Sequence, residues 1–188
     1  MRRSRFAETR NMAGIGRATH VERTVRGMAR DEGLRDELLA MVGNRPDPDA
    51  LRAHAERLWE ILDDYEVWPG RRLVGDDGSR AAWLIAQFAI EDPGLQRRCL
   101  EALEVAVAYG DADPVHYAYL VDRVRMADGL DQLYGSQFVL SRDGELMPWP
   151  VDDPAKVEVR RKRLGLSSFG EHAAEMTEQW RRRQAPPD

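Results

Sequence analysis

The chain of 188 residues carries a net charge of −5, and 43% of its residues are hydrophobic while 32% are charged. This length suits one domain with a sizeable core, and the apolar fraction excludes an intrinsically disordered chain. The negative charge argues against a dedicated nucleic-acid binder, and no apolar run reaches the roughly 18 to 20 residues that span a bilayer. The single cysteine, Cys99, excludes an internal disulfide and a cysteine-rich metal site, so we expect a cytoplasmic protein.

The domain organisation follows from where periodic apolar patterns begin and end. Residues 1–20 are basic and lack such a pattern, and no apolar run typical of a signal peptide follows them. We interpret them as a flexible arm, 21–183 as a single mostly helical domain, and 184–188 as a frayed tail.

The first part of the domain predicts two helices and a loop. The first helix covers about 20–42, and the second begins at Asp47-Pro48, where aspartate caps the helix and proline occupies its first turn. The second helix has one stripe of apolar residues spaced by three and four positions, formed by Leu51, Ala55, Leu58, Leu62 and Tyr65. The next segment, 67–79, is rich in turn-forming residues and predicts a loop.

Three further helices are predicted in the middle of the chain. Residues 81–90 are apolar on every side except at Gln87, which indicates a fully buried central helix. The Asp-Pro pairs at 92–93 and 113–114 repeat the start signal of a capping residue followed by proline. The last of these helices is expected to end near Gly129.

The hydrophobic period changes after this glycine. Residues 136–151 predict two short strands joined at Asp143-Gly144, a dipeptide typical of tight hairpin turns. The final helices are predicted over 154–163 and 168–183. The sequence therefore predicts a mainly α fold, a single-domain helical array with a small β-hairpin near its C-terminal third.

A set of short motifs extends over most of the chain. In order they are Trp68-Pro69, Val74-Gly75, Gln87, Asp122-Arg123, Gln132, Tyr134-Gly135, Gln137, Pro150, Asp153-Pro154, Arg160-Arg161 and Gly165-Leu166. Together they resemble a bacterial family catalogued as domain of unknown function 6624, and the resemblance covers about 23–177. Members of that family carry a histidine where this chain has Phe88, and a threonine where it has Ser136. The family has no assigned activity, so the resemblance locates a site without naming its use.

Three polar side chains on the predicted helices allow two explanations each. Gln87 either bonds a nearby loop carbonyl or points into a ligand pocket, because an unpaired buried amide costs about 1–3 kcal/mol. Asp122 and Arg123 are consecutive on a helix and diverge by about 100°, so each needs a separate partner. Arg160 or Arg161 could pair with Asp122 in a buried network, whereas Arg123 could recognise an anion.

The segment DQLYGSQF, at 131–138, joins the predicted helix to the hairpin. Gly135 is expected to adopt a backbone conformation closed to other residues, which turns the chain from helix to strand. A turn does not require Gln132, Tyr134 and Gln137 as well. Their hydrogen-bonding groups either satisfy buried loop amides or line a small-ligand pocket.

Signatures of the common catalytic and metal sites are missing from the sequence. It contains no Gly-x-Ser-x-Gly motif, no phosphate-binding glycine loop with lysine, and no His-Glu-x-x-His helix. Asp111, Asp113 and His116 could supply metal ligands, but Asp113 is better explained as a helix cap, and Cys99 as a buried small hydrophobe. The basic run at 160–163 is interpreted as a solvated helix face, so no metal, cofactor or nucleic acid is predicted.

Two functions follow as hypotheses. In the first, the protein handles a small polar ligand, and the predicted substrate-binding residues are Trp68, Gln87, Arg123, Gln132, Gln137 and Arg160. Asp122 would then be the general acid or base and Tyr134 a hydrogen-bond donor. The chemistry would be metal-independent hydrolysis, cyclisation or isomerisation of a polar metabolite, as in bacterial secondary metabolism. In the second, the protein is a non-catalytic binding module, such as an immunity or regulatory protein with a protein partner, which Phe88 in place of histidine favours.

Overall fold

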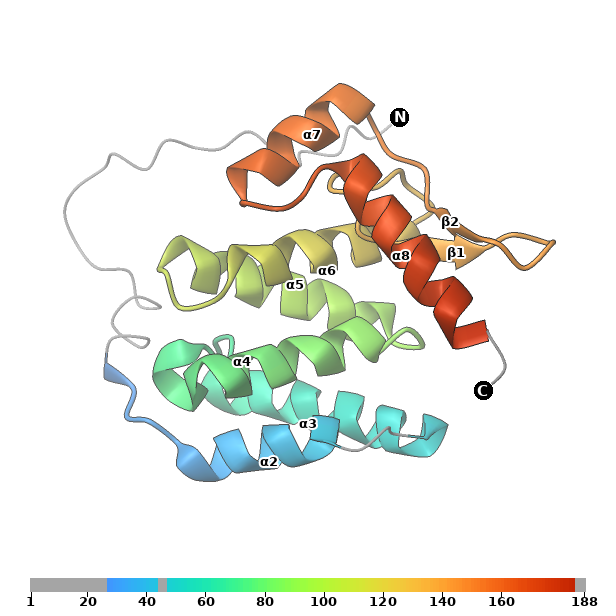
Figure 1. Cartoon of the computed structure of the whole chain (residues 1–188). Coiled ribbons are helices and arrows are strands. Elements are labelled where there is room, and N and C mark those ends of the chain that lie inside the picture. Colours follow the sequence, from blue (N-terminus) through green and yellow to red (C-terminus); the bar gives the residue numbers. More distant parts are fainter. Residues whose placement is uncertain (1–26, 44–46, 185–188) are drawn as a thin grey trace, which may run out of the picture.

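The computed structural model describes residues 27–43 and 47–184, and Figure 1 shows the arrangement of its elements. Within these residues the elements are α2 (Glu32–Gly43), α3 (Pro48–Tyr65), α4 (Arg71–Phe88), α5 (Pro93–Ala108), α6 (Pro114–Ala127), β1 (Phe138–Leu140), β2 (Leu146–Pro148), α7 (Pro154–Arg163) and α8 (Phe169–Gln184). The predicted mainly α fold with one small hairpin is confirmed. The part of the predicted arm and first helix at 1–26 lies outside the described residues.

The helices pack around α4, which contacts α2, α3, α5 and α6. Their shared core is built from the apolar stripe predicted for α3, from one face of α5, and from residues along the whole length of α4. The largest fully buried apolar side chains are Trp68, Leu38, Leu58, Ile61, Leu62, Leu95, Leu103, Leu120 and Val74. Cys99 is also fully buried in this core, as predicted, and burial raises the pKa of its thiol.

Three predicted boundaries are wrong. The helix predicted over about 20–42 is not continuous, because residues 28–31 are not helical. α2 begins at Glu32, where the Asp31 carboxylate caps it by accepting the N–H of Leu34 at 2.8 Å. The buried helix predicted over 81–90 ends at Phe88, which is 53% exposed. The segment 67–79, predicted as a loop, is mostly helical, because α4 begins at Arg71.

The start of α4 is capped by a residue from a distant loop. Gly70 occupies the N-cap position and has no side chain to accept a hydrogen bond. Instead, the N–H of Arg71 donates to the carbonyl of Asp111 at 2.8 Å, and the N–H of Arg72 donates to the Oδ1 of Asp111 at 2.9 Å. The Asp111 side chain is buried, and this burial raises the pKa of its carboxyl although the Arg72 bond opposes the shift. A cap supplied from the α5–α6 loop leaves no local signal in the sequence, which explains the wrong prediction.

The hairpin, α7 and α8 form the C-terminal end of the molecule (Figure 1). β1 and β2 pair antiparallel, with Val139 opposite Met147, around the predicted turn at Gly144. α8 contacts β2 and α7, and His172 is its only buried residue. No helix in the described ranges has the length and apolar character that a membrane crossing requires.

Gly70→Ala is expected to lower the free energy of unfolding by about 1–3 kcal/mol, because overpacking a fitted site has this cost. A Cβ at Gly70 would overlap Oδ2 of Asp111 and lie 2.8 Å from its carbonyl oxygen. Urea unfolding measures the change. Gly170→Ala in the first turn of α8 is the matched control, because a Cβ there meets nothing within 4 Å. It should leave stability unchanged or raise it by about 0.5–1 kcal/mol. Equal effects of the two substitutions would contradict the capping role of Asp111.

Candidate functional site

The carboxylate of Asp122 connects α6 to the segment that leads into the hairpin. Asp122 is on α6 and fully buried, and it accepts hydrogen bonds from the segment 133–136 that follows the helix. The donors are the N–H groups of Leu133 at 2.7 Å, Tyr134 at 3.1 Å and Ser136 at 3.0 Å, and the Ser136 hydroxyl at 2.9 Å. Burial raises the pKa of the Asp122 carboxyl, and these bonds oppose the shift. Both carboxylate oxygens are therefore engaged in holding backbone.

Two arginines of α7 bind backbone carbonyls of the same segment, whose N–H groups are bound by Asp122. The Nη1 of Arg160 donates to the carbonyl of Leu133 at 3.3 Å, and the Nη1 of Arg161 donates to the carbonyl of Tyr134 at 2.8 Å. The predicted direct pair between Asp122 and one of these arginines is not among the ion pairs of the described residues. Instead, the peptide between Leu133 and Tyr134 donates its N–H to the carboxylate and offers its carbonyl to a guanidinium.

The two glutamines of the segment also bind backbone. Gln132 is fully buried, and its Nε2 donates to the carbonyls of Gln137 at 3.1 Å and Trp149 at 2.6 Å, while its Oε1 accepts the N–H of Gln137 at 2.8 Å. The Nε2 of Gln137 donates to the hydroxyl of Ser136 at 2.9 Å and to the carbonyl of Tyr119 at 3.3 Å. Gln132 therefore satisfies buried loop amides, which is one of the two explanations that the sequence allowed.

The conformation of Gly135 completes this turn. Its φ is +70°, as expected from the sequence, in the left-handed region that favours glycine. A Cβ at this position would also overlap the ring of Phe169, lying 2.6 Å from Cε2. The glycine thus permits both the turn and the close approach of α8.

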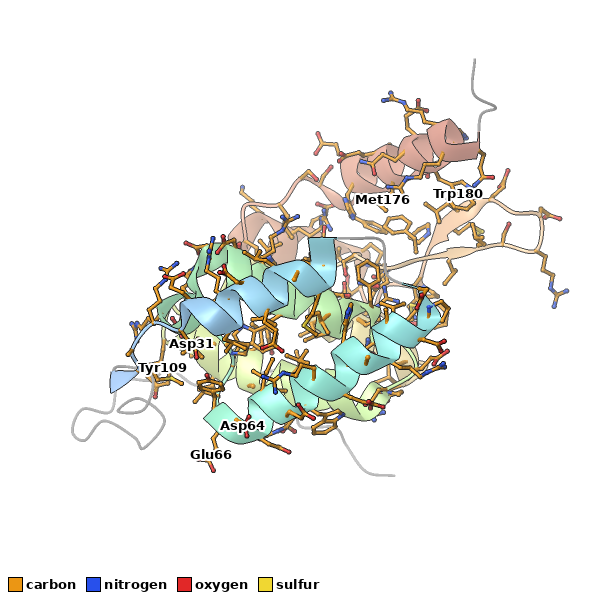
Figure 2. The ribbon with its side chains drawn as sticks, turned by 90° about the horizontal axis from the view of Figure 1, so that it is seen from below. Asp31, Asp64, Glu66, Tyr109, Met176 and Trp180 are labelled. Carbon is orange, nitrogen blue, oxygen red and sulfur yellow. The ribbon has the colours of Figure 1, made fainter. Side chains whose placement is uncertain are left out.

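A pocket of about 240 Å³ lies between α6, the hairpin and α8. Its lining residues are Arg123, Ser136, Gln137, Phe138, Leu146, Met176, Gln179, Trp180 and Arg183. Figure 2 shows Met176 and Trp180 on the side of α8 that faces the hairpin, and the indole N–H of Trp180 donates to the Gly144 carbonyl at 3.4 Å. Arg123 and Gln137 are the two predicted site residues that line it. The α8 residues were missed, although the four-residue spacing of Met176 and Trp180 indicates that both lie on one helix face.

Arg123 is the half-buried cation of the pocket lining, and it has no counter-ion among the described residues. Burial lowers the pKa of its guanidinium. Its Nε donates to the Oε1 of Gln87 at 3.4 Å, and no carboxylate in the described ranges forms an ion pair with it. The Nε2 of Gln87 is buried and has no hydrogen-bond partner within the described part of the chain.

A scan against family profiles matches residues 17–181 to a family of unknown function, DUF6624. The chain belongs to this family. The matched range contains all the motif residues given above, including Asp122, Arg123, Gln132 and Gln137. No curated protein and no solved structure matches the chain.

Several predicted site residues of this DUF6624 chain lie elsewhere. Trp68 is buried in the core, where its indole N–H donates to the Ser79 hydroxyl at 3.1 Å, and neither Tyr134 nor Arg160 lines the pocket. Phe88 is exposed and so does not occupy an interior space in place of the family histidine.

The three residues considered as metal ligands have other partners. Asp111 caps α4, Asp113 caps α6 by accepting the N–H of Val115 at 2.8 Å, and the ring of His116 stacks on Trp83 at 4.3 Å. Within the described residues, no three His, Cys, Asp or Glu side chains are grouped so that they could hold a metal ion. The structure thus assigns these residues to capping and packing.

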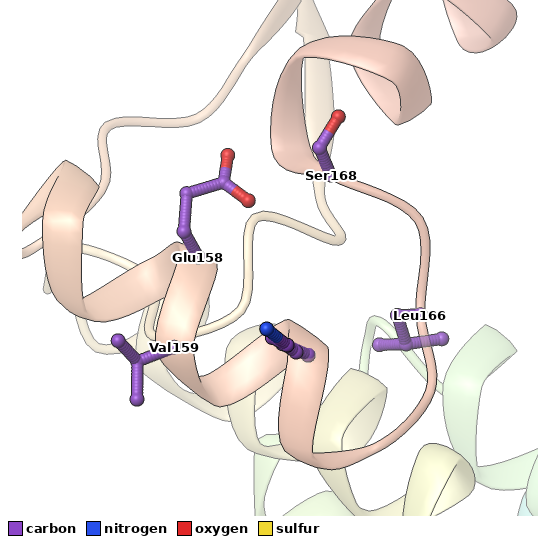
Figure 3. Close-up of a pocket in the computed structure, with 5 residues that line it drawn as sticks. Glu158, Val159, Leu166 and Ser168 are labelled. Carbon is purple, nitrogen blue, oxygen red and sulfur yellow. The ribbon is translucent and has the colours of Figure 1, made fainter.

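A second depression of about 330 Å³ lies between α7 and the loop that precedes α8 (Figure 3). It is lined by Glu158, Val159, Lys162, Leu166 and Ser168. The Glu158 carboxylate already accepts the N–H of Phe169 at 3.0 Å, and Ser168 is engaged in a reciprocal capping box with Glu171. The carboxylate of Glu158 and the hydroxyl of Ser168 are thus already engaged within the protein, so this depression is the weaker candidate site.

Asp122→Asn is expected to lower the free energy of unfolding by about 1–3 kcal/mol, because an amide NH₂ would face backbone donors that the carboxylate now satisfies. Chemical denaturation measures the loss. Asp131→Asn is the matched control, because Asp131 is an exposed neighbour of the segment and should change stability by less than about 0.5 kcal/mol. If the two substitutions cost the same, Asp122 does not hold the 133–136 segment.

Proposed function

We propose that this protein binds a small anion with an apolar, planar body in the pocket between α6, the hairpin and α8, and that it does so without catalysis. The observation that carries the proposal is the half-buried Arg123, which lines the pocket and has no carboxylate partner among the described residues. Removing a charge from water is costly unless an opposite charge compensates it. A ligand carboxylate or phosphate would supply that charge.

The contact with Gln87 orients the guanidinium for this task. Gln87 accepts the Nε–H of Arg123, while the two terminal nitrogens have no partner within the described ranges. The planar guanidinium presents paired donors that match the two oxygens of a carboxylate or phosphate. Arg183 at the rim of the pocket adds a second positive charge.

The walls of the pocket favour an apolar body attached to the anionic group. Phe138 and Leu146 come from the hairpin, and Met176 and Trp180 come from α8. The volume is below the roughly 300–1,000 Å³ of pockets that hold drug-sized ligands. The pocket therefore suits a compact ligand, such as an aromatic carboxylate.

The hydrogen bonds of Asp122 favour binding over catalysis. A general base must reach the proton that it abstracts, directly or through one water. The two oxygens of Asp122 accept bonds from Leu133, Tyr134 and Ser136, and Asp122 does not line the pocket. These bonds support the second hypothesis from the sequence, a non-catalytic binding module. The ligand proposed here is a small molecule and not a protein partner.

Benzoate is the probe for this proposal, and benzamide is its neutral counterpart of the same shape. Benzoate should shift the NMR signal of the Trp180 indole N–H, and benzamide should bind at least about tenfold more weakly because a charge-assisted hydrogen bond contributes about 1.5–3 kcal/mol. Arg123→Met should weaken benzoate binding by a similar factor. Arg182→Gln is the control, because Arg182 pairs with Glu178 on α8 and does not line the pocket.

Three outcomes would overturn the proposal. Benzamide could bind as tightly as benzoate, Arg123→Met could retain the affinity, or benzoate, acetate and inorganic phosphate could all leave the Trp180 signal unchanged. Unchanged folding of Arg123→Met, checked by its unfolding curve, separates a lost anion contact from a lost structure.

A further inference from the structure

His172 is the buried contact of α8 with the hairpin and α6. It is 9% exposed and is the only buried residue of that helix. Its ring forms T-shaped contacts with two aromatic rings. The distance between ring centroids is 5.5 Å to Phe138 of β1 and 6.3 Å to Tyr119 of α6. Its Nε2 is buried and has no hydrogen-bond partner within the described part of the chain. The site thus accommodates an imidazole and offers no acceptor for a second N–H.

The charges around His172 also disfavour an imidazolium. Arg161 of α7 lowers the pKa of His172, and Glu175, one turn further along α8, raises it. Tyr119 and Phe138, from the other two elements packed against it, present uncharged rings. Burial is the largest influence and lowers the pKa of His172 from its ordinary value.

We propose that His172 is a pH-sensitive latch: its protonation detaches α8 from the hairpin and α6, and this disassembles the ligand pocket. Four pocket residues belong to α8, namely Met176, Gln179, Trp180 and Arg183. The last step rests on the proposed function, because it assumes that this pocket binds the ligand. Detachment of α8 itself does not depend on any ligand.

The direction of the pH effect follows from the lowered pKa. The unfolded or detached segment carries an ordinary histidine, which titrates near pH 6.5. The docked helix therefore gains its full stability from His172 above about pH 6.5 and loses it as the pH falls through the lower pKa of the docked form. Acid, not base, should open the latch.

Two indole N–H signals in NMR spectra test the latch in the intact protein without ligand. Trp180 donates to Gly144 of the hairpin and reports on α8, whereas Trp68 donates to Ser79 in the core. Between about pH 7.5 and about pH 5, the Trp180 signal should move to that of a solvent-exposed indole, with one midpoint below about pH 6.5. The Trp68 signal should stay in place.

Variants assign the transition to one side chain. His172→Phe keeps an aromatic ring against Tyr119 and Phe138 and should hold the Trp180 signal constant over the whole range. His172→Gln, uncharged and smaller, should also abolish the transition if the phenylalanine does not fit. His116→Phe is the control, because burial lowers the pKa of His116 too while its ring stacks on Trp83. It should leave the transition intact.

The outcomes separate the latch from the proposed function. The latch is overturned if the Trp180 signal does not move in acid, or if it moves equally in His172→Phe and His172→Gln. The Trp180 signal could move only when His172 is present while benzoate does not bind at about pH 7.5. In that case the pH-dependent detachment of α8 is supported, and its control of benzoate binding is contradicted. If benzoate binds equally at both ends of the pH range, the link between α8 and the pocket is overturned.

Discussion

The carboxylate of Asp122 holds the segment 133–136, and the C-terminal end of the fold depends on that interaction. It gathers three backbone N–H groups and a hydroxyl, while the guanidinium groups of Arg160 and Arg161 bind carbonyls of the same segment. Hydrogen bonds to charged groups are about twice as strong as those between neutral groups. The segment 133–136 therefore joins the negative charge of Asp122 on α6 to the positive charges of Arg160 and Arg161 on α7. This fixes the position at which the hairpin begins.

Neighbouring residues on α6 divide two roles. Asp122 points into the turn and is fully satisfied, whereas Arg123 points away by about 100°, lines the pocket, and has the amide of Gln87 as its one hydrogen-bond partner among the described residues. The same turn places Ser136 and Gln137 on the wall of that pocket. Asp122 thus holds the turn, and the next residue carries a charge that has no counter-ion in the described part of the chain. The proposed binding site relies on this combination. α8 completes the walls, and His172 is the one residue of this helix that is buried.

Local chemistry made much of the fold predictable. Asp47, Asp92 and Asp113 each cap the helix that follows them, and Gly135 has the positive φ that its place in the turn suggested. The start of α4 was not predictable, because its capping group on Asp111 lies about forty positions away along the chain. The candidate site shows the same limit. Arg123 and Gln137 were among the predicted site residues and line the pocket. The sequence could not show that Asp122 and Gln132 bind backbone, because identical side chains serve either purpose. Trp180 carries no motif, and only the packing of α8 brings it to the pocket.

Hydrogen exchange of the Leu133 and Ser136 amides tests the central claim most directly, because these N–H groups donate to Asp122 at 2.7 Å and 3.0 Å. If the carboxylate holds the turn, both amides should exchange about as slowly as those of the buried helix α4, which open only when the whole domain unfolds. Exchange as fast as that of the exposed hairpin tip at Asp143 would contradict the account, since the turn would then be open much of the time and the pocket beside it would not be preorganised.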